Sequence, residues 1–188
     1  MIKKRILKLR SKFSEYNIDG YIIPKNDEFF SEYSQKNRLK TISNFTGSAG
    51  FAIVLKNKNY LFVDGRYTIQ ANIEASKDYK IISIDKIINC NLFKNLIIGF
   101  DPKLFTSEQI KKIFLKNNQA KEIKLNLVDS VKDKYKSKPF FSLKKSITGE
   151  SHLYKIKKIV NFLKKKKSNY LFVSLPENVA WLLNIRGY

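Results

Sequence analysis

The chain has 188 residues, 43% of them apolar, with fourteen Phe, ten Tyr, a single cysteine (Cys90) and a formal net charge of +21. The apolar and aromatic content excludes a chain that is disordered throughout, and one cysteine excludes both a disulfide framework and a cysteine-based zinc site. There is no run of about 18 apolar residues and no uninterrupted apolar stretch near the N-terminus, so we expect a cytoplasmic protein without a transmembrane helix or signal peptide.

Hydrophobic patterning predicts an α/β domain over residues 1–138. In chain order we expect an amphipathic helix over 2–13, a strand over 21–23 ended by Pro24, strands over 51–55 and 60–63, a helix over 67–75, strands over 79–84 and 96–100, a helix over 106–116 and a strand over 123–128. The four residues 56–59 join two strands as a hairpin, which makes that pair antiparallel. Strands that alternate with helices, together with one hairpin, indicate a mixed sheet flanked by helices.

A second unit begins near Gly149, after a linker over residues 139–148. We expect a helix over 151–166, a strand over 170–174 and a helix over 176–183. A helix, a strand and a helix are too little chain to enclose a core, so we interpret residues 149–188 as the truncated start of a domain. Its expected exposed apolar patch lies around Val179, Leu182 and Leu183. We find no internal repeat in the sequence.

Common catalytic motifs are absent: the sequence has no phosphate-binding loop, no serine nucleophile elbow and no zinc-binding His-Glu-x-x-His segment. The only histidine, His152, cannot build a histidine metal site, and Cys90 has no base near it in sequence to activate its thiol. Asp64 and Asp101 each follow a strand, where carboxylates often serve function in α/β folds. Each is also an ordinary turn-forming residue, so a catalytic carboxylate pair is only one of two interpretations.

Two glycine-containing stretches indicate special backbone geometry. Residues 45–50 (Phe-Thr-Gly-Ser-Ala-Gly) precede a strand, where a close approach or a positive φ favours glycine. Residues 64–67 (Asp-Gly-Arg-Tyr) join a strand to a helix, with Asp64 placed to cap the helix and Arg66 projecting from its first turn. The Arg66 guanidinium suits a carboxylate or carbonyl ligand, and it equally suits a salt bridge that fastens the turn.

Several motifs stand in one order along nearly the whole chain: Ser31-Glu-Tyr33, Arg38, Ser43–Gly50, Asp64–Tyr67, Gln70-Ala71, Asn126–Asp129, Gly149–Ser151 with Lys155 and Ile156, and Leu175–Tyr188. Together they resemble the N-terminal region of aminopeptidase P, the Xaa-Pro aminopeptidases of the creatinase/prolidase superfamily. The chain is most similar to the three-domain form, in which two creatinase-type N-terminal domains precede the catalytic one. The resemblance implies one such domain over 1–138 and the start of a similar one over 149–188.

The resemblance implies a hydrolase that removes an N-terminal residue preceding proline. In that family a C-terminal domain holds two metal ions, usually manganese, with two Asp, one His and two Glu as ligands. One histidine cannot supply both a ligand and the assisting histidines, so the chain is expected to hold no metal and to be inactive alone. Its implied roles are in the substrate cleft and in a homo-oligomer interface, and its implied partners are the catalytic portion and peptides with proline at the second position.

One functional residue of the family falls within this chain. In family members the Arg of the Asp-Gly-Arg motif contacts the substrate, and Arg66 occupies that position, with Asp64, Gly65 and Tyr67 as its supports. Two departures stand out. Residues 27–33 lack the histidine of many relatives, and Asn44 stands where relatives often have glycine. Asparagine tolerates a positive φ better than most residues, so the backbone can keep its course there.

Two other classes of function remain open. One is a standalone, non-catalytic module that binds a peptide or a protein through the Arg66 turn. The other is nucleic-acid binding through the basic excess, for instance through residues 164–167 (four Lys). Only five of the 37 basic residues are Arg, which bidentate recognition of phosphate and guanine favours, so we expect binding to nucleic acid to be non-specific and salt-sensitive.

Overall fold

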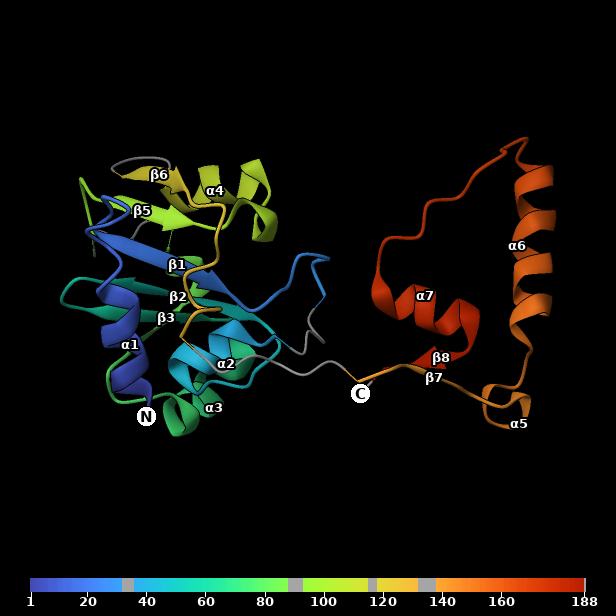
Figure 1. Cartoon of the computed structure of the whole chain (residues 1–188), viewed down its shortest axis with the longest axis horizontal. Coiled ribbons are helices and arrows are strands. Elements are labelled where there is room, and N and C mark those ends of the chain that lie inside the picture. The colour runs from blue at the N-terminus through green and yellow to red at the C-terminus, as the bar shows by residue number, and fades with distance from the viewer. Residues whose placement is uncertain (32–35, 88–92, 115–117, 132–137, 188) are drawn as a thin grey trace. The chain divides into compact units, whose positions relative to one another are not determined.

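The computed structural model describes residues 1–31, 36–87, 93–114, 118–131 and 138–187 (Figure 1). The chain forms two compact units, Met1–Lys134 and Tyr135–Tyr188. Each unit is described by itself below. No helix among these residues is long and apolar enough to cross a membrane.

The first unit is built on a six-stranded sheet in the order β4-β3-β2-β1-β5-β6. Its strands are β1 (Gly20–Pro24), β2 (Gly50–Leu55), β3 (Asn59–Val63), β4 (Lys80–Ser83), β5 (Ile97–Phe100) and β6 (Gln119–Glu122). Only β2 runs antiparallel to its neighbours; the pairs β1–β5, β3–β4 and β5–β6 are parallel. The structure therefore confirms the mixed sheet and the antiparallel hairpin, whose connection is one residue shorter than expected because β3 already begins at Asn59.

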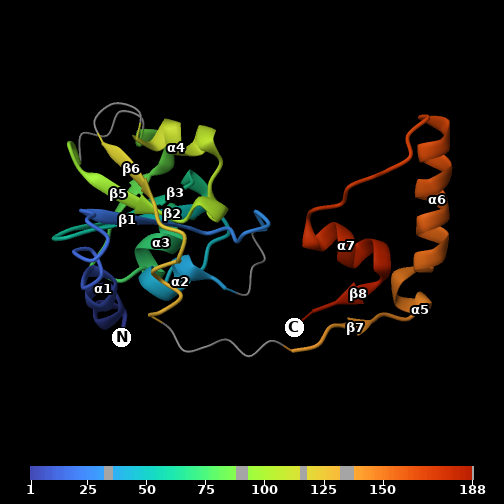
Figure 2. The ribbon, with the colours of Figure 1, turned by 45° about the horizontal axis from the view of Figure 1, so that its top comes forward.

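Helices cover both faces of this sheet (Figure 2). They are α1 (Ile2–Arg10), α2 (Arg38–Ser43), α3 (Thr68–Glu74) and α4 (Ser107–Phe114). Tyr21 and Ile23 of β1 pack into a core that includes residues of α1, α2 and α3, whereas Ile22 between them packs into a second core with Phe114 of α4. Because side chains alternate along a strand and both faces are covered, the central strands are almost continuously apolar.

The expected strand over residues 123–128 is wrong. The strand that pairs with β5 is β6, four residues earlier, and all of its residues are exposed. Ile123, Leu127 and Val128 are buried, but they lie in an irregular segment that packs into the core beside α1 and α2. These residues are apolar because they are buried, not because they form a strand. The edge strand β6 has no alternation of apolar and polar residues, so the pattern could not predict it.

One helix of the first unit was not expected from the pattern. Helix α2 begins where the Asn37 side chain accepts a hydrogen bond from the backbone N–H of Lys40 at 2.9 Å. It ends at Asn44, whose φ of 72° is left-handed. Asparagine is one of the few residues that adopt this conformation readily, so Asn44 is tolerated there as expected.

The second unit consists mainly of helices. They are α5 (Lys145–Thr148), α6 (His152–Lys165) and α7 (Pro176–Leu183), together with the two-stranded antiparallel sheet of β7 (Phe141–Ser142) and β8 (Ile185–Arg186). The expected helices over 151–166 and 176–183 are confirmed. Of the expected apolar patch, Leu183 is exposed and Val179 and Leu182 are half-buried.

The expected strand over residues 170–174 is wrong for this structure. The segment is irregular, and its Tyr170, Leu171 and Phe172 side chains are exposed. A strand requires a neighbour to satisfy its backbone hydrogen bonds. Among the residues that the structure describes, no strand pairs with this segment.

Candidate functional site

The Asp-Gly-Arg-Tyr stretch forms a tight turn at the carboxyl end of β3. Gly65–Tyr67 make one turn of 3₁₀ helix that leads into α3. The Asp64 carboxylate caps this turn by accepting a hydrogen bond from the backbone N–H of Arg66 at 2.9 Å. The capping role predicted for Asp64 is therefore confirmed, and it fixes where the Arg66 side chain leaves the backbone.

Arg66 folds back onto its own cap. Its Nε donates to Asp64 Oδ1 at 2.9 Å and its Nη2 donates to Oδ2 at 3.3 Å, while the guanidinium carbon lies 5.6 Å from the centre of the Tyr67 ring. These hydrogen bonds hold the pKa of the Asp64 carboxyl below its ordinary value. This is the salt bridge that fastens the turn, one of the two roles predicted for Arg66. The side chain is nevertheless 74% exposed, so solutes can reach the guanidinium.

The second glycine-containing stretch lies against this turn. The Ser48 hydroxyl and the Tyr67 hydroxyl are 2.7 Å apart and share a hydrogen bond. The rings of Phe45 and Tyr67 meet edge to face, with centroids 6.0 Å apart and an interplanar angle of 78°. Phe45 is completely buried and belongs to the core beneath the turn. The structure thus brings together the two stretches that the sequence analysis singled out.

A polar network ties α3 to the same stretch. The Glu74 carboxylate accepts hydrogen bonds from the backbone N–H of Thr46 at 2.7 Å, from the Thr46 hydroxyl and from the Gln70 amide at 2.9 Å. Partial burial alone would raise the pKa of Glu74, but these donors outweigh it and the pKa lies below its ordinary value. The ionised Glu74 carboxylate therefore holds the segment before β2 against α3. The Arg66 turn leads directly into this helix.

The glycines of the two stretches meet different demands. Gly50 has a φ of +143°, and a Cβ there would lie 2.7 Å from the backbone oxygen of Phe62. A Cβ on Gly47 would meet the Phe45 ring. Gly65, in contrast, lacks a positive φ, and a Cβ there would meet nothing within 4 Å. The backbone requires glycine at position 50 but not at position 65.

This contrast gives a matched pair of variants. Gly50→Ala should lower the free energy of unfolding by about 1–3 kcal/mol, because the added methyl strikes backbone on a residue with a disfavoured φ. Gly65→Ala should change it by less than about 0.5 kcal/mol. Urea denaturation of both variants and the unmodified chain measures the difference. Equal stability of the two variants would contradict the geometry described for residues 45–50.

A buried ion cluster links three segments that are distant in sequence. Arg38, at the start of α2, is 3% exposed and makes a two-pronged salt bridge with Asp129: Nε to Oδ1 at 2.7 Å and Nη2 to Oδ2 at 2.8 Å. Its Nη2 also donates to the Glu28 carboxylate at 2.7 Å. Burial alone would lower the pKa of Arg38, but the two carboxylates outweigh it and raise the pKa above its ordinary value. The Arg38 cluster fastens the segment around Asp129 to α2 and to the loop that follows β1.

Arg38 and Asp129 stand in separate motifs of the sequence, and neither motif predicts that the two side chains pair. Glu28 lies within residues 27–33, where the family resemblance implies a histidine, and its carboxylate is part of the Arg38 cluster. Arg38 also lowers the pKa of Glu28 below its ordinary value, against the opposing effect of burial. An arginine is always charged, so a buried arginine requires carboxylate partners. This requirement is the signal that could have indicated the pairing.

The remaining candidates do not form a site. The structure separates Asp64 from Asp101. Asp64 follows β3 and Asp101 follows β5, and β2 and β1 lie between these two strands in the sheet. Neighbouring strands are about 4.8 Å apart, so the ends of β3 and β5 are about 14 Å apart. Asp101 is buried and accepts a hydrogen bond from the Asn126 amide at 3.0 Å, so it is a structural turn residue. A carboxylate pair of these two residues is therefore wrong. His152 is exposed on α6, and Cys90 lies outside the described residues.

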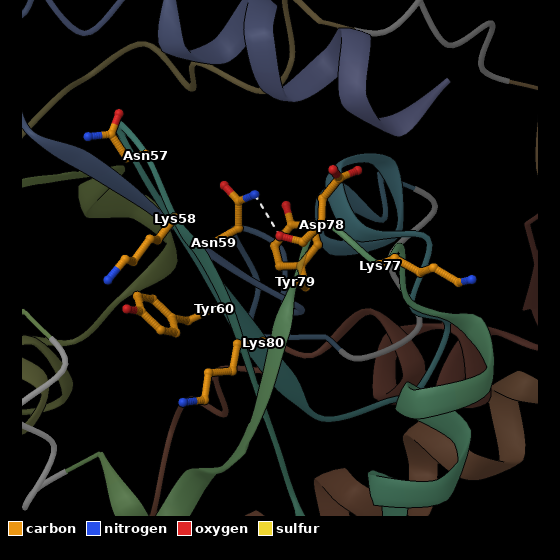
Figure 3. A pocket seen from close by; sticks show the side chains of 8 residues that line it. All are labelled: Asn57, Lys58, Asn59, Tyr60, Lys77, Asp78, Tyr79 and Lys80. Atoms are coloured by element: carbon orange, nitrogen blue, oxygen red, sulfur yellow. Dashed lines mark hydrogen bonds between the residues drawn. The ribbon is translucent and has the colours of Figure 1, made fainter.

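An open pocket of about 620 Å³ lies at the other end of the strands from the Arg66 turn (Figure 3). It is lined by residues 57–60 and 77–80, which come from the start of β3 and the start of β4. The Asn59 amide donates to the backbone oxygen of Asp78 at 2.9 Å and closes one side. Three lysines line the pocket, but none of the residues that the sequence analysis singled out reaches it.

The described side chains offer little to a metal ion. Within the described ranges, no three His, Cys, Asp or Glu residues are grouped so that they could hold a metal ion. Glu28 and Asp129 share one cation, since both pair with the Arg38 guanidinium. These residues do not fit the two-metal centre that the family resemblance implies.

Comparison with known protein families identifies both units. The model of the creatinase/prolidase N-terminal domain matches residues 5–129, and a second model of the same description matches residues 131–188. A probable Xaa-Pro aminopeptidase P from Laccaria bicolor is 34% identical over 98% of this chain, which covers 32% of that protein. Xaa-Pro aminopeptidase 1 from Dictyostelium discoideum is 30% identical over 99% of the chain, which covers 34% of that protein.

Solved structures agree with these matches. The crystal structure of X-prolyl aminopeptidase from Caenorhabditis elegans, described as a cytosolic enzyme with a di-nuclear active site, superimposes with a TM-score of 0.74 and 28% identity. The alignment covers 100% of this chain and 35% of that one. The Xaa-Pro dipeptidase from Bacillus anthracis shares the fold, with a TM-score of 0.56 and 20% identity over 86% of this chain and 44% of that chain.

Proposed function

Because the chain belongs to the family of creatinase/prolidase N-terminal domains, we propose that it acts as the N-terminal, non-catalytic region of an Xaa-Pro aminopeptidase. The observation that carries the proposal is the pattern of coverage. The relatives align with nearly all of this chain, whereas the chain spans about a third of the length of the curated relatives it matches. The complete enzyme would remove an N-terminal residue that precedes proline.

The hydrolytic chemistry would take place outside these 188 residues. In the complete enzyme a two-metal centre in the catalytic portion, with manganese as the metal that the resemblance implies, would supply the hydrolytic chemistry. The side chains described here do not form such a centre, so their part is to bind and position the peptide. A cytosolic location and a homo-oligomeric state belong to the same proposal, the first because a similar enzyme is described as cytosolic.

Arg66 is the residue that we assign to substrate binding. Its guanidinium is exposed, always charged and aimed by the Asp64 cap, and it can donate to a peptide carbonyl or carboxylate. Asp64 holds the side chain while no ligand is bound. Tyr67 supports the turn from beneath, through Ser48 and Phe45. An incoming peptide oxygen would share the guanidinium with Asp64 or take over one of its hydrogen bonds.

The test replaces Arg66 in the complete enzyme. Arg66→Ala should lower kcat/KM for an Xaa-Pro peptide by about 10- to 100-fold, the effect of one lost charge-assisted hydrogen bond. Its stability should stay unchanged, because the Arg66–Asp64 salt bridge is exposed. Steady-state kinetics and thermal unfolding measure the two effects.

Arg66→Lys and Gly65→Ala serve as matched controls. Lysine keeps the charge but not the planar fork, so it should restore only part of the activity. Gly65→Ala leaves the fold unchanged and tests whether a peptide passes close to the turn. Full activity of Arg66→Ala would contradict a substrate-binding role for this residue.

A further inference from the structure

The open pocket at the start of β3 and β4 is basic (Figure 3). Its lining includes three lysines, Lys58, Lys77 and Lys80, against a single acid, Asp78. Among the residues that the structure describes, none of these three ammonium groups is part of a salt bridge. The Asp78 carboxylate accepts a hydrogen bond from the Ser76 hydroxyl at 2.7 Å. The pocket therefore keeps a net positive charge.

Two of the lysines lie on the same face of the sheet. The register of the strands pairs Tyr60 of β3 with Lys80 of β4, and paired residues of adjacent strands point to one face. Figure 3 shows the side chains of Lys58, Tyr60 and Lys80 on one side of the strands and that of Lys77 on the other. From the strand spacing and the rise per residue, the Cα atoms of Lys58 and Lys80 are about 8 Å apart. Their long side chains can therefore reach one ligand together.

The strands that carry these two lysines are held firmly. The buried Tyr60 ring packs against two neighbouring aromatic rings, with centroids 6.4 and 6.2 Å away. The Asn59 side chain accepts a hydrogen bond from Arg10 Nη2 at 2.9 Å and donates one to the backbone oxygen of Asp78 at 2.9 Å. The Arg10 guanidinium adds a further positive charge next to the pocket wall. A ligand would therefore have to order only the two lysine side chains and not the strands beneath them.

The side chains that line the pocket indicate the chemistry of its ligand. Ammonium groups bind anions, and phosphate oxygens accept charge-assisted hydrogen bonds from them. Both tyrosines of the lining, Tyr60 and Tyr79, are buried, so they offer little ring surface on which a nucleobase could stack. The volume of about 620 Å³ leaves room for more than one phosphate group. These features favour a small anion of several phosphate groups, bound through its charge.

We propose that this pocket binds a small polyphosphate anion, of the pyrophosphate or triphosphate class, between the ammonium groups of Lys58 and Lys80. The site is separate from the Arg66 turn: six residues lead from Lys58 along β3 to Asp64, which is about 20 Å of extended chain. The proposal therefore does not depend on the proposed function. The bound anion would stabilise the first unit, because the two lysines are brought together only in the folded chain.

Titration of the 188-residue chain with sodium pyrophosphate tests the proposal. Calorimetry at about 150 mM salt, which screens exposed charges, should show saturable binding. Amide signals of residues 57–60 and 77–80 should shift along the same titration curve when it is followed by NMR. At about 10 mM pyrophosphate a ligand of millimolar affinity is bound, so the absence of saturable shifts in these residues up to that concentration would overturn the proposal.

Two double variants separate the pocket from the overall charge of the chain. The pocket variant, Lys58→Ala with Lys80→Ala, should raise the dissociation constant for pyrophosphate by about 10- to 100-fold, because it removes the charge-assisted hydrogen bonds. The control variant, Lys111→Ala with Lys112→Ala, removes the same charge from α4, which packs beside β6 at the opposite edge of the sheet. It should change the constant by less than about 2-fold. Equal losses in both variants would overturn the proposal.

Urea denaturation gives an independent measure of the same binding. Without pyrophosphate both double variants should be as stable as the unmodified chain, because all four lysines are exposed. Saturating pyrophosphate should raise the urea midpoint of the unmodified chain and of the control variant, and should leave that of the pocket variant unchanged. An equal rise in the pocket variant would contradict binding between Lys58 and Lys80.

Binding of nucleic acid is distinguished with the same two variants. A single-stranded DNA of about 16 nucleotides serves as the probe. If it binds through the general basic excess, its affinity should fall equally in the pocket variant and in the control variant, and its binding should be lost at high salt. A loss of DNA binding confined to the pocket variant, with pyrophosphate binding unchanged there, would make nucleic acid the occupant and overturn the proposal.

Discussion

Replacing Phe45 by alanine is expected to lower the free energy of unfolding of the first unit by about 3–5 kcal/mol, the range for truncating a fully buried Phe. The ring is completely buried, lies directly beneath Gly47 and Gly50, and meets the Tyr67 ring edge to face. Its removal leaves a cavity between the core and the Arg66 turn. The loss is a large share of the 5–15 kcal/mol by which most domains are stable.

Urea denaturation followed by circular dichroism measures this loss. Phe29→Ala is the matched control, because Phe29 is 60% exposed and its truncation should cost less than about 0.5 kcal/mol. Phe45→Leu should retain much of the stability, since it fills part of the cavity. Similar stabilities for the Phe45→Ala and Phe29→Ala variants would contradict the packing described for the turn.

Removing the buried guanidinium should have the second largest effect. Arg38→Met is expected to lower the free energy of unfolding by about 3 kcal/mol, because it leaves Asp129 and Glu28 without the charge that compensates them. The expected loss lies at the lower end of the range for a buried ion pair, since both carboxylates are partly exposed. Lys40→Met removes an exposed charge from the same helix and should cost less than about 0.5 kcal/mol.

The pH dependence of this loss provides a second test. The pKa of Glu28 is lower in the folded chain than its ordinary value of 4.5, so the Glu28 interaction stabilises the fold fully above that value. The stabilisation disappears as the pH falls through the lowered pKa and the carboxyl takes up a proton. The difference in stability between the unmodified chain and Arg38→Met should therefore narrow below about pH 4.5. A difference that is constant or widens in acid would exclude the ion pair as its cause.

Patterning predicts the elements whose side chains face a core. The amphipathic first helix and the hairpin of β2 and β3 follow from residues that the fold buries. The two helices of the second unit follow from the same kind of apolar pattern, although α6 buries only Lys155 and α7 buries none of its residues. Strand β6 could not be predicted in this way, because an exposed edge strand carries polar residues on both faces. Helix α2 is six residues long and is defined by its two asparagine caps more than by its apolar residues.

The candidate site was predictable in parts. The Asp64 cap and the close approach at residues 45–50 follow from the chemistry of Asp and Gly at a strand end. That these two stretches meet through Ser48 and Tyr67 depends on the order of the strands, which the sequence alone does not specify. The same holds for the separation of Asp64 from Asp101 and for the pairing of Arg38 with Asp129, which lie 91 residues apart.

The predicted strand at residues 170–174 shows that a local apolar pattern does not by itself decide whether a strand forms. Its run of Tyr, Leu, Phe and Val is typical of a buried strand, but strand formation depends on neighbours. The hydrophobic pattern thus indicates which side chains a segment can bury. Whether the segment forms a strand and buries them depends on a neighbouring strand.

Peptidase activity tests the central claim most directly. The purified 188-residue chain is assayed with a peptide that has proline at the second position, in the presence of manganese, beside a chimera in which this chain replaces the matched third of the Laccaria bicolor relative. We expect no hydrolysis above background for the chain alone, and hydrolysis by the chimera that falls when Arg66 is replaced by alanine. Release of the N-terminal residue by the 188-residue chain alone would contradict its assignment as a non-catalytic region.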